Sequence, residues 1–169
     1  MRLNPNTSMK THSNGNLMNY IVRNDMIIKF YDFIEDSKLK FAVIISKYKG
    51  KLIFCKHRER NTYEIPGGHR EDGESIIDTA KRELTEETGA KTFSILPVCV
   101  YSVTGKNRIN EEGSETFGML FVAEINEFYD EIHSEIERIE FFDEMPSELT
   151  YPLIQPHLMN EYTRRTQQG

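Results

Sequence analysis

The chain has 169 residues and a formal net charge of −6, from 21 lysines and arginines against 27 aspartates and glutamates. This length suits one domain with its own core, and the acidic total argues against broad binding to nucleic acid or anionic membranes. Its longest apolar runs, such as residues 41–45, are far shorter than the roughly 20 residues of a membrane-spanning helix. The sequence therefore predicts a globular protein, with neither nucleic acid nor a membrane as its partner.

Residues 1–19 are rich in Asn, Ser and Thr and lack a hydrophobic period, which predicts a disordered leader before one domain over residues 20–165. The leader has no apolar segment of the kind found in signal peptides. The two cysteines, Cys55 and Cys99, are too few for a disulfide framework or a zinc site. We expect both in the core, and the protein in the reducing cytoplasm.

Apolar and β-prone stretches alternate with polar loops along the rest of the chain. Strands are predicted at residues 23–35, 41–46, 52–56, 98–103, 117–125 and 139–142, and helices at residues 74–88 and 149–162. The second and third strands flank the turn at residues 47–50, which predicts a hairpin. Residues 57–73 contain Pro66, Gly67 and Gly68 and predict a loop. This order predicts a mixed β-sheet sandwiched between helices, an α/β (α+β) fold.

The first predicted helix places a stripe of carboxylates beside its apolar stripe. At about 100° per residue, Glu83, Glu86 and Glu87 fall next to Ala80 and Leu84. The pair Glu83–Glu87 is repulsive at i,i+4, and acidic residues in the last turn oppose the helix dipole. Three carboxylates clustered at this local cost suit Mg²⁺ or Mn²⁺. The helix alone leaves open a second interpretation, a solvated acidic face.

The spacing around this helix matches a longer motif. Gly68 is followed after five residues by Glu74, and after seven more by Arg82-Glu83-Leu84-Thr85-Glu86-Glu87-Thr88-Gly89-Ala90. This resembles the Nudix box, G-x5-E-x7-R-E-U-x-E-E-x-G-U, in which U is aliphatic, and every fixed position matches. The resemblance extends over about residues 22–160 and implies the Nudix fold.

The resemblance also implies an activity and a set of ligands. Nudix hydrolases cleave a nucleoside diphosphate linked to another moiety, using Mg²⁺ or Mn²⁺ bound at the box. By similarity, the metal ligands are the carboxylates of Glu83, Glu86 and Glu87 and the carbonyl of Gly67. Arg82 is expected to pair with Glu86 and orient it, and Glu74 to brace the loop before the helix.

Nudix hydrolases often add a remote acid as a ligand or general base. Glu135 is our first choice for this catalytic residue, with Glu131 and Glu115 as alternatives. The surrounding stretch is acidic throughout, so solvated side chains are the competing interpretation.

Basic residues precede the Pro-Gly-Gly loop and are candidates for binding substrate phosphates. They are His57, Arg58 and Arg60, although a solvated basic turn is an alternative. Tyr63 is a candidate for stacking on a base, or it packs in the protein.

Three functions compete. The first is a MutT-type pyrophosphohydrolase of a (deoxy)nucleoside triphosphate such as 8-oxo-dGTP, which residues 63–68 and the single-domain length favour by analogy. The second is an ADP-ribose or nucleotide-sugar pyrophosphatase, which the polar leader disfavours. The third is a non-catalytic nucleotide-binding module, which the complete box disfavours. A small-molecule nucleotide is the expected partner, and the oligomeric state stays open.

Overall fold

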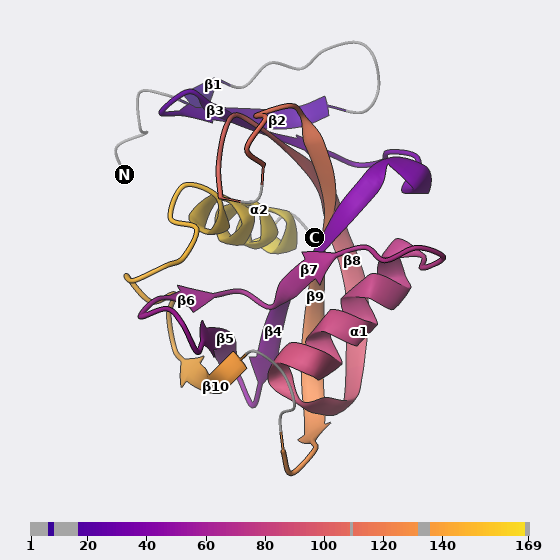
Figure 1. Ribbon diagram of the computed structural model, residues 1–169, viewed down its shortest axis with the longest axis vertical. Helices are drawn as coiled ribbons and strands as arrows, with labels where there is room; N and C mark the ends of the chain where they lie inside the picture. The colour runs from indigo at the N-terminus through magenta and orange to yellow at the C-terminus, as the bar shows by residue number, and fades with distance from the viewer. Residues whose placement is uncertain (1–6, 9–16, 109, 132–135, 168–169) are drawn as a thin grey trace.

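The computed structural model describes residues 7–8, 17–108, 110–131 and 136–167. In these residues the backbone forms one sheet of ten strands, with helices α1 (Ile76–Thr88) and α2 (Gln155–Gln167) on opposite sides of it (Figure 1). Neither helix is long and apolar enough to cross a lipid bilayer. The predicted mixed sheet sandwiched between helices is confirmed.

The main path of the sheet runs β1-β2-β3-β8-β9-β4-β5-β10, while β6 pairs with β5 and β7 with β4. The strands are β1 (Thr7–Ser8), β2 (Leu17–Arg23), β3 (Met26–Tyr31), β4 (Leu39–Tyr48), β5 (Lys51–His57), β6 (Tyr63–Glu64), β7 (Gly67–His69), β8 (Ala90–Thr104), β9 (Thr116–Phe128) and β10 (Ile136–Phe142). A short 3-10 helix, η1 (Asp36–Lys38), precedes β4.

β4 and β9 lie at the centre of the sheet and run parallel, with Ile44 opposite Phe121. Ile44 and Ile45 are each at most 1% exposed, although neighbouring side chains of a strand point to opposite faces. Burial on both faces is typical of a strand that helices cover on both sides. The predicted hairpin of β4 and β5 is confirmed by the pairing of Tyr48 with Lys51.

The strand predicted at residues 23–35 is instead part of a hairpin of β2 and β3. Asn24 and Asp25 join the two strands with φ angles of +46° and +64°. Left-handed φ at both turn positions matches the twist of the strands, and Asn and Asp tolerate it. Because β2 begins at Leu17, the predicted disorder is wrong for residues 17–19. Residues 7–8 pair with β2 as β1, and the rest of the predicted leader lies outside the described residues.

Two apolar clusters, one on each face of the sheet, hold the helices in place. α1 contributes Ile76, Ala80 and Leu84 to one cluster, at the i, i+4 and i+8 positions of one helix face. α2 contributes Leu158 to the other. Leu84 and Leu158 are both 0% exposed, and burial of each stabilises the fold by about 2 kcal/mol. Cys55 and Cys99 are also buried, as predicted.

The ends of α1 are set by its own sequence. Ser75 is the N-cap, and its hydroxyl accepts a 3.3 Å hydrogen bond from the N–H of Asp78. The helix therefore begins two residues later than predicted. Gly89 ends it in the left-handed conformation, at φ +74°, and donates its N–H to the carbonyl of Thr85 at 2.9 Å.

α2 begins at Gln155, later than the predicted start at residue 149. The preceding segment is bound to β6, because the N–H of Thr150 donates to the carbonyl of Tyr63 at 2.9 Å. The N–H of Tyr63 in turn donates to the carbonyl of Glu148 at 2.8 Å. These bonds hold Leu149 in a bridge to Tyr63 and keep the backbone around it out of a helix.

Candidate active site

A cavity of about 380 Å³ lies among the central strands, the Pro-Gly-Gly loop and the start of α2. This volume is in the range of small-molecule sites, roughly 300–1,000 Å³. The box contributes Gly68, His69, Glu71, Glu83 and Glu87 to its lining. The rest of the chain contributes Phe41, Ala42, Val43, His57, Arg60, Glu64, Ile65, Gly67, Tyr101, Val103, Asn107, Thr116, Tyr151, Ile154, Gln155 and Leu158. Folding therefore brings the box together with residues from both halves of the chain.

The Pro-Gly-Gly segment approaches α1 closely because Gly68 has no side chain, and it approaches β4 closely because Gly67 has none. A Cβ atom on Gly68 would overlap the carboxylate of Glu83. The N–H of Gly67 donates to Glu87 Oε2 at 2.8 Å. This segment thus meets Glu83 through the space left at Gly68, and Glu87 through the backbone N–H of Gly67.

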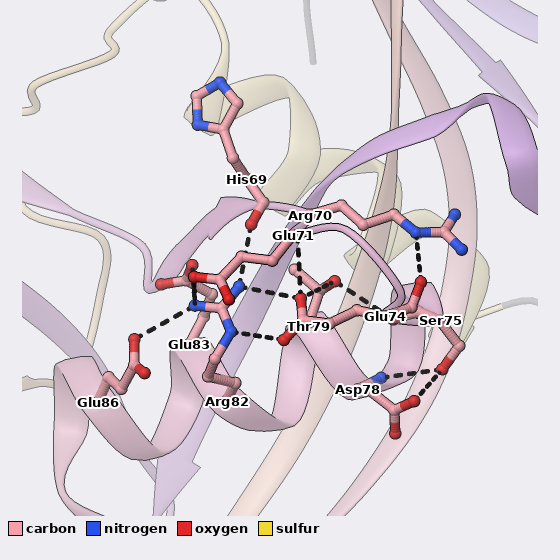
Figure 2. Close-up of polar contacts among 10 residues, drawn as sticks. All are labelled: His69, Arg70, Glu71, Glu74, Ser75, Asp78, Thr79, Arg82, Glu83 and Glu86. Carbon is pink, nitrogen blue, oxygen red and sulfur yellow. Dashed lines mark hydrogen bonds and ion pairs between the residues drawn. The ribbon is translucent and has the colours of Figure 1, made fainter.

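Arg82 is the centre of a carboxylate network beside the loop (Figure 2). Its Nε donates to Glu74 at 2.6 Å, and its Nη1 donates to Glu83 at 2.8 Å and to Glu86 at 3.2 Å. The predicted Arg82–Glu86 pair is therefore present, but it is the longest of the three. Nη2 donates to the carbonyl of His69 at 3.0 Å, which joins α1 to β7.

Glu74 closes the loop between β7 and α1. Besides Arg82, it accepts hydrogen bonds from the N–H of Glu71 at 3.1 Å and from the hydroxyl of Thr79 at 2.8 Å. The hydrogen bond from Arg82 is the main cause that lowers the pKa of Glu74 to about 2. An ionised Glu74 thus braces the start of α1, as predicted for this residue.

The three box carboxylates lie in different environments. Glu87 is 7% exposed, and the side chain of Glu83 is 12% exposed, whereas that of Glu86 is 52% exposed and lies outside the cavity lining. Burial raises the pKa of Glu83, although Arg82 opposes this shift. Among the described residues, no three His, Cys, Asp or Glu side chains are arranged as a metal site. In this structure Glu83 and Glu86 both accept hydrogen bonds from Arg82, and Glu87 accepts one from Gly67.

Two of the four predicted substrate-binding residues, His57 and Arg60, line the cavity. Arg60 Nη1 donates to Glu64 Oε2 at 2.9 Å, and the side chains are 25% and 10% exposed. This ion pair places one positive and one negative group at the cavity wall. Arg58 is exposed in the turn after β5 and is not a lining residue.

Tyr63, the fourth of these residues, is not among the residues that line the cavity. Its ring packs edge-to-face on Phe142, with the ring centroids 5.1 Å apart, and its hydroxyl donates to Glu140 at 2.9 Å. Packing, the alternative interpretation, therefore describes Tyr63 better than stacking on a base.

The remote acid is not located. Glu135 lies outside the described residues. Glu131 is exposed, and neither Glu131 nor Glu115 lines the cavity. Glu115 Oε1 instead accepts hydrogen bonds from Ser102 at 2.7 Å and from Lys29 at 3.1 Å. Burial opposes its ionisation, but these bonds hold the pKa of Glu115 below its ordinary value.

Sequence reasoning missed several residues of the cavity, among them Glu64, Tyr101 and Gln155. They lie on β6, β8 and α2 and are separated by many residues, with no motif that joins them. Only the burial of a charged or amide side chain could have indicated that these residues belong to the cavity, and burial is known only from the folded chain. Neither cysteine lines the cavity, and burial raises the pKa of Cys99 to about 12, so neither acts as a thiolate nucleophile.

Comparison with known proteins identifies the family. Residues 36–160 match the family model of the NUDIX domain. The crystal structure of the Bacillus subtilis pyrophosphohydrolase BsRppH superposes with a TM-score of 0.70 over 87% of this chain and 97% of that one, at 21% identity. The NUDIX domain of Shewanella oneidensis NrtR, solved with ADP ribose, gives a TM-score of 0.58 over 79% of this chain and 90% of that one, at 14% identity. The fold, the box and the family match together show that the chain belongs to the Nudix hydrolase family.

A curated relative adds a named reaction. A Bacillus subtilis protein provisionally named 8-oxo-dGTP diphosphatase YtkD is 33% identical over 87 residues, which are 52% of this chain. The alignment covers 54% of that relative, or about half of its length.

Proposed function

We propose that this protein is a divalent-metal-dependent Nudix pyrophosphohydrolase, which cleaves a (deoxy)nucleoside triphosphate such as 8-oxo-dGTP to the monophosphate and pyrophosphate. The observation that carries the proposal is the cavity, in which Glu83 and Glu87 of a complete Nudix box line the wall together with Arg60 and aromatic residues. The named diphosphatase relative supports the choice of substrate.

The oxygen atoms of the candidate metal ligands fit Mg²⁺ or Mn²⁺, because these ions prefer carboxylate and carbonyl oxygens. Glu83 and Glu86 already share one cationic atom, Arg82 Nη1, at 2.8 and 3.2 Å. A metal at the site would be held by Glu83, Glu86 and Glu87, with the Gly67 carbonyl as a further ligand. When bound, it would neutralise the substrate diphosphate and help to activate water.

Arg82 is a positioning residue in this proposal. Its bonds to Glu74 and to the His69 carbonyl do not depend on the metal ligands, so the guanidinium stays anchored if Glu83 and Glu86 turn toward an ion. The arginine would then hold the two ligands near their place while Glu74 keeps its charge balanced.

The other residues of the cavity bind and orient the substrate. Arg60 and His57 offer hydrogen-bond donors to phosphate oxygens at the wall. The water oxygen attacks one phosphorus, the phosphoanhydride bond breaks, and the pyrophosphate leaves with the bonding electron pair. Glu135 remains our proposal for the base that takes the proton of the water.

A hydrolysis panel tests the proposal. Purified protein is incubated with Mg²⁺ and with 8-oxo-dGTP, the normal (d)NTPs, ADP-ribose, NADH or nucleotide sugars, and the products are identified. We expect a nucleoside monophosphate and pyrophosphate, and no turnover in EDTA. AMP with ribose phosphate from ADP-ribose would instead support the nucleotide-sugar alternative. No turnover of any compound would support the binding module.

A further inference from the structure

Gln155, the first residue of α2, carries a buried amide whose oxygen is unbonded. The residue is 4% exposed, and within the described part of the chain Oε1 accepts no hydrogen bond. A buried polar atom without a partner is unfavourable, so most such atoms in native proteins are bonded. The backbone here is not disturbed, because the N–H of Gln155 donates to the Tyr151 carbonyl at 3.0 Å. The group that lacks a hydrogen-bond partner is therefore the side-chain oxygen, not the backbone.

Gln155 lines the same cavity as Glu83 and Glu87. The two carboxylates belong to α1, whereas Gln155 begins α2, and the helices pack on opposite faces of the sheet (Figure 1). Ile154 and Leu158 of the same segment also line the cavity. The lining thus combines carboxylates of α1 with apolar side chains and an amide-bearing residue of α2.

We propose that Gln155 is a specificity-determining residue that hydrogen-bonds the nucleobase of the substrate. Its Oε1 accepts from a base N–H, and its NH2 group donates to the neighbouring acceptor of the same base. This inference rests on the proposed function for the class of substrate. An amide presents an acceptor beside a donor, which matches the paired donors and acceptors along a base edge. A base without the matching pair would leave buried groups unbonded and bind more weakly.

The test compares the wild type with Gln155→Leu and Gln155→Asn, and with Gln167→Leu as a matched control at the exposed end of α2. Calorimetry measures the binding of product monophosphates (8-oxo-dGMP, dGMP and dAMP) and of ribose 5-phosphate, all with Mg²⁺ and without turnover. We expect Gln155→Leu to weaken the binding of the tightest-binding monophosphate by about tenfold or more, which is about 1.4 kcal/mol. Gln155→Asn should weaken this binding too, because the shorter side chain places the amide farther from the base. Ribose 5-phosphate should bind all four proteins alike.

Thermal unfolding separates this role from a structural one. Because Gln155→Leu removes an unbonded polar group, its Tm should equal or exceed that of the wild type, whereas loss of a structural amide would lower it. The proposal is overturned if Gln155→Leu binds ribose 5-phosphate and the monophosphates more weakly to the same extent. It is also overturned if Gln155→Leu binds the monophosphates like the wild type, or if the wild type binds no monophosphate. A wild type that hydrolyses no nucleotide, yet binds one through Gln155, would refute the proposed function and leave the base contact standing.

Discussion

The backbone N–H of Gly67 donates a 2.8 Å hydrogen bond to the carboxylate of Glu87, which joins the loop before α1 to the last turn of that helix. The bond holds a carboxylate that is only 7% exposed at the wall of the cavity. A negative charge in the last turn opposes the helix dipole by about 0.3–1 kcal/mol. The proposed role of Glu87 as a metal ligand would explain why a charge is kept at this position.

Glu87→Gln should abolish activity without unfolding the protein. The amide oxygen still accepts the Gly67 N–H, and removal of the charge relieves the dipole conflict, so Tm should stay the same or rise slightly. Loss of one metal carboxylate should lower kcat by about a thousandfold or more. Steady-state kinetics with Glu112→Gln, an exposed loop residue, as the control measure this effect. Wild-type kcat in Glu87→Gln would exclude Glu87 as a ligand.

Gly68→Ala and Gly67→Ala should fail in different ways. A Cβ at Gly68 overlaps the Glu83 carboxylate, which can turn away, so kcat/KM should fall about tenfold or more with a stability loss of about 1 kcal/mol. A Cβ at Gly67 overlaps the backbone carbonyl of Ala42, which cannot turn away, so the loss should reach about 1–3 kcal/mol. Urea unfolding and kinetics on both variants check this. Equal stability of the two would contradict the contact with Ala42.

Arg60 and Arg58 are a matched pair of tests for substrate binding. Arg60→Gln removes the positive partner of Glu64 in the cavity and leaves a carboxylate there that repels an anionic substrate. We expect KM to rise about tenfold or more, the equivalent of at least about 1.4 kcal/mol. Arg58→Gln, outside the lining, should leave KM unchanged. A similar rise in both variants would point to general charge attraction rather than to contact in the cavity.

Glu161 should make stability depend on acidic pH. Its side chain is 2% exposed and accepts hydrogen bonds from Arg164 at 2.6 Å and Arg165 at 2.8 Å. Burial opposes ionisation, but these bonds outweigh it and hold the pKa of Glu161 below its ordinary value of 4.5. The stabilisation is therefore full above about pH 4.5 and is lost as the pH falls toward the folded-state pKa.

Glu161→Gln tests this directly. The variant should lose about 3 kcal/mol at neutral pH, the low end for a broken buried ion pair, because both arginines keep some contact with water. Its free energy of unfolding should fall less steeply than that of the wild type between about pH 5 and pH 3. Urea titrations across this range measure both effects, with Glu112→Gln as the exposed control. Parallel curves for wild type and variant would show that Glu161 does not titrate in this way.

The predicted elements differ in how well local sequence anticipated them. α1 and the hairpin of β4 and β5 were anticipated because caps, turns and a helical period act over a few neighbouring residues. The β2–β3 hairpin was missed, since Asn24-Asp25 is a weaker turn signal than a glycine-containing pair. The start of α2 was misplaced because Tyr63, far away in the sequence, binds the backbone at Thr150.

Local sequence was likewise sufficient to place Glu83, Glu86 and Glu87 on one helix and to indicate oxygen ligands for a divalent ion. Spacing along a helix determines which side chains lie near one another, whatever the rest of the chain does. The folded chain alone shows that Gln155 lines the cavity with Glu83, and that Arg60 and Tyr101 line it too. These relations depend on the packing of α1 and α2 against opposite faces of one sheet. They are contacts between distant segments, for which no local period or spacing is a signal.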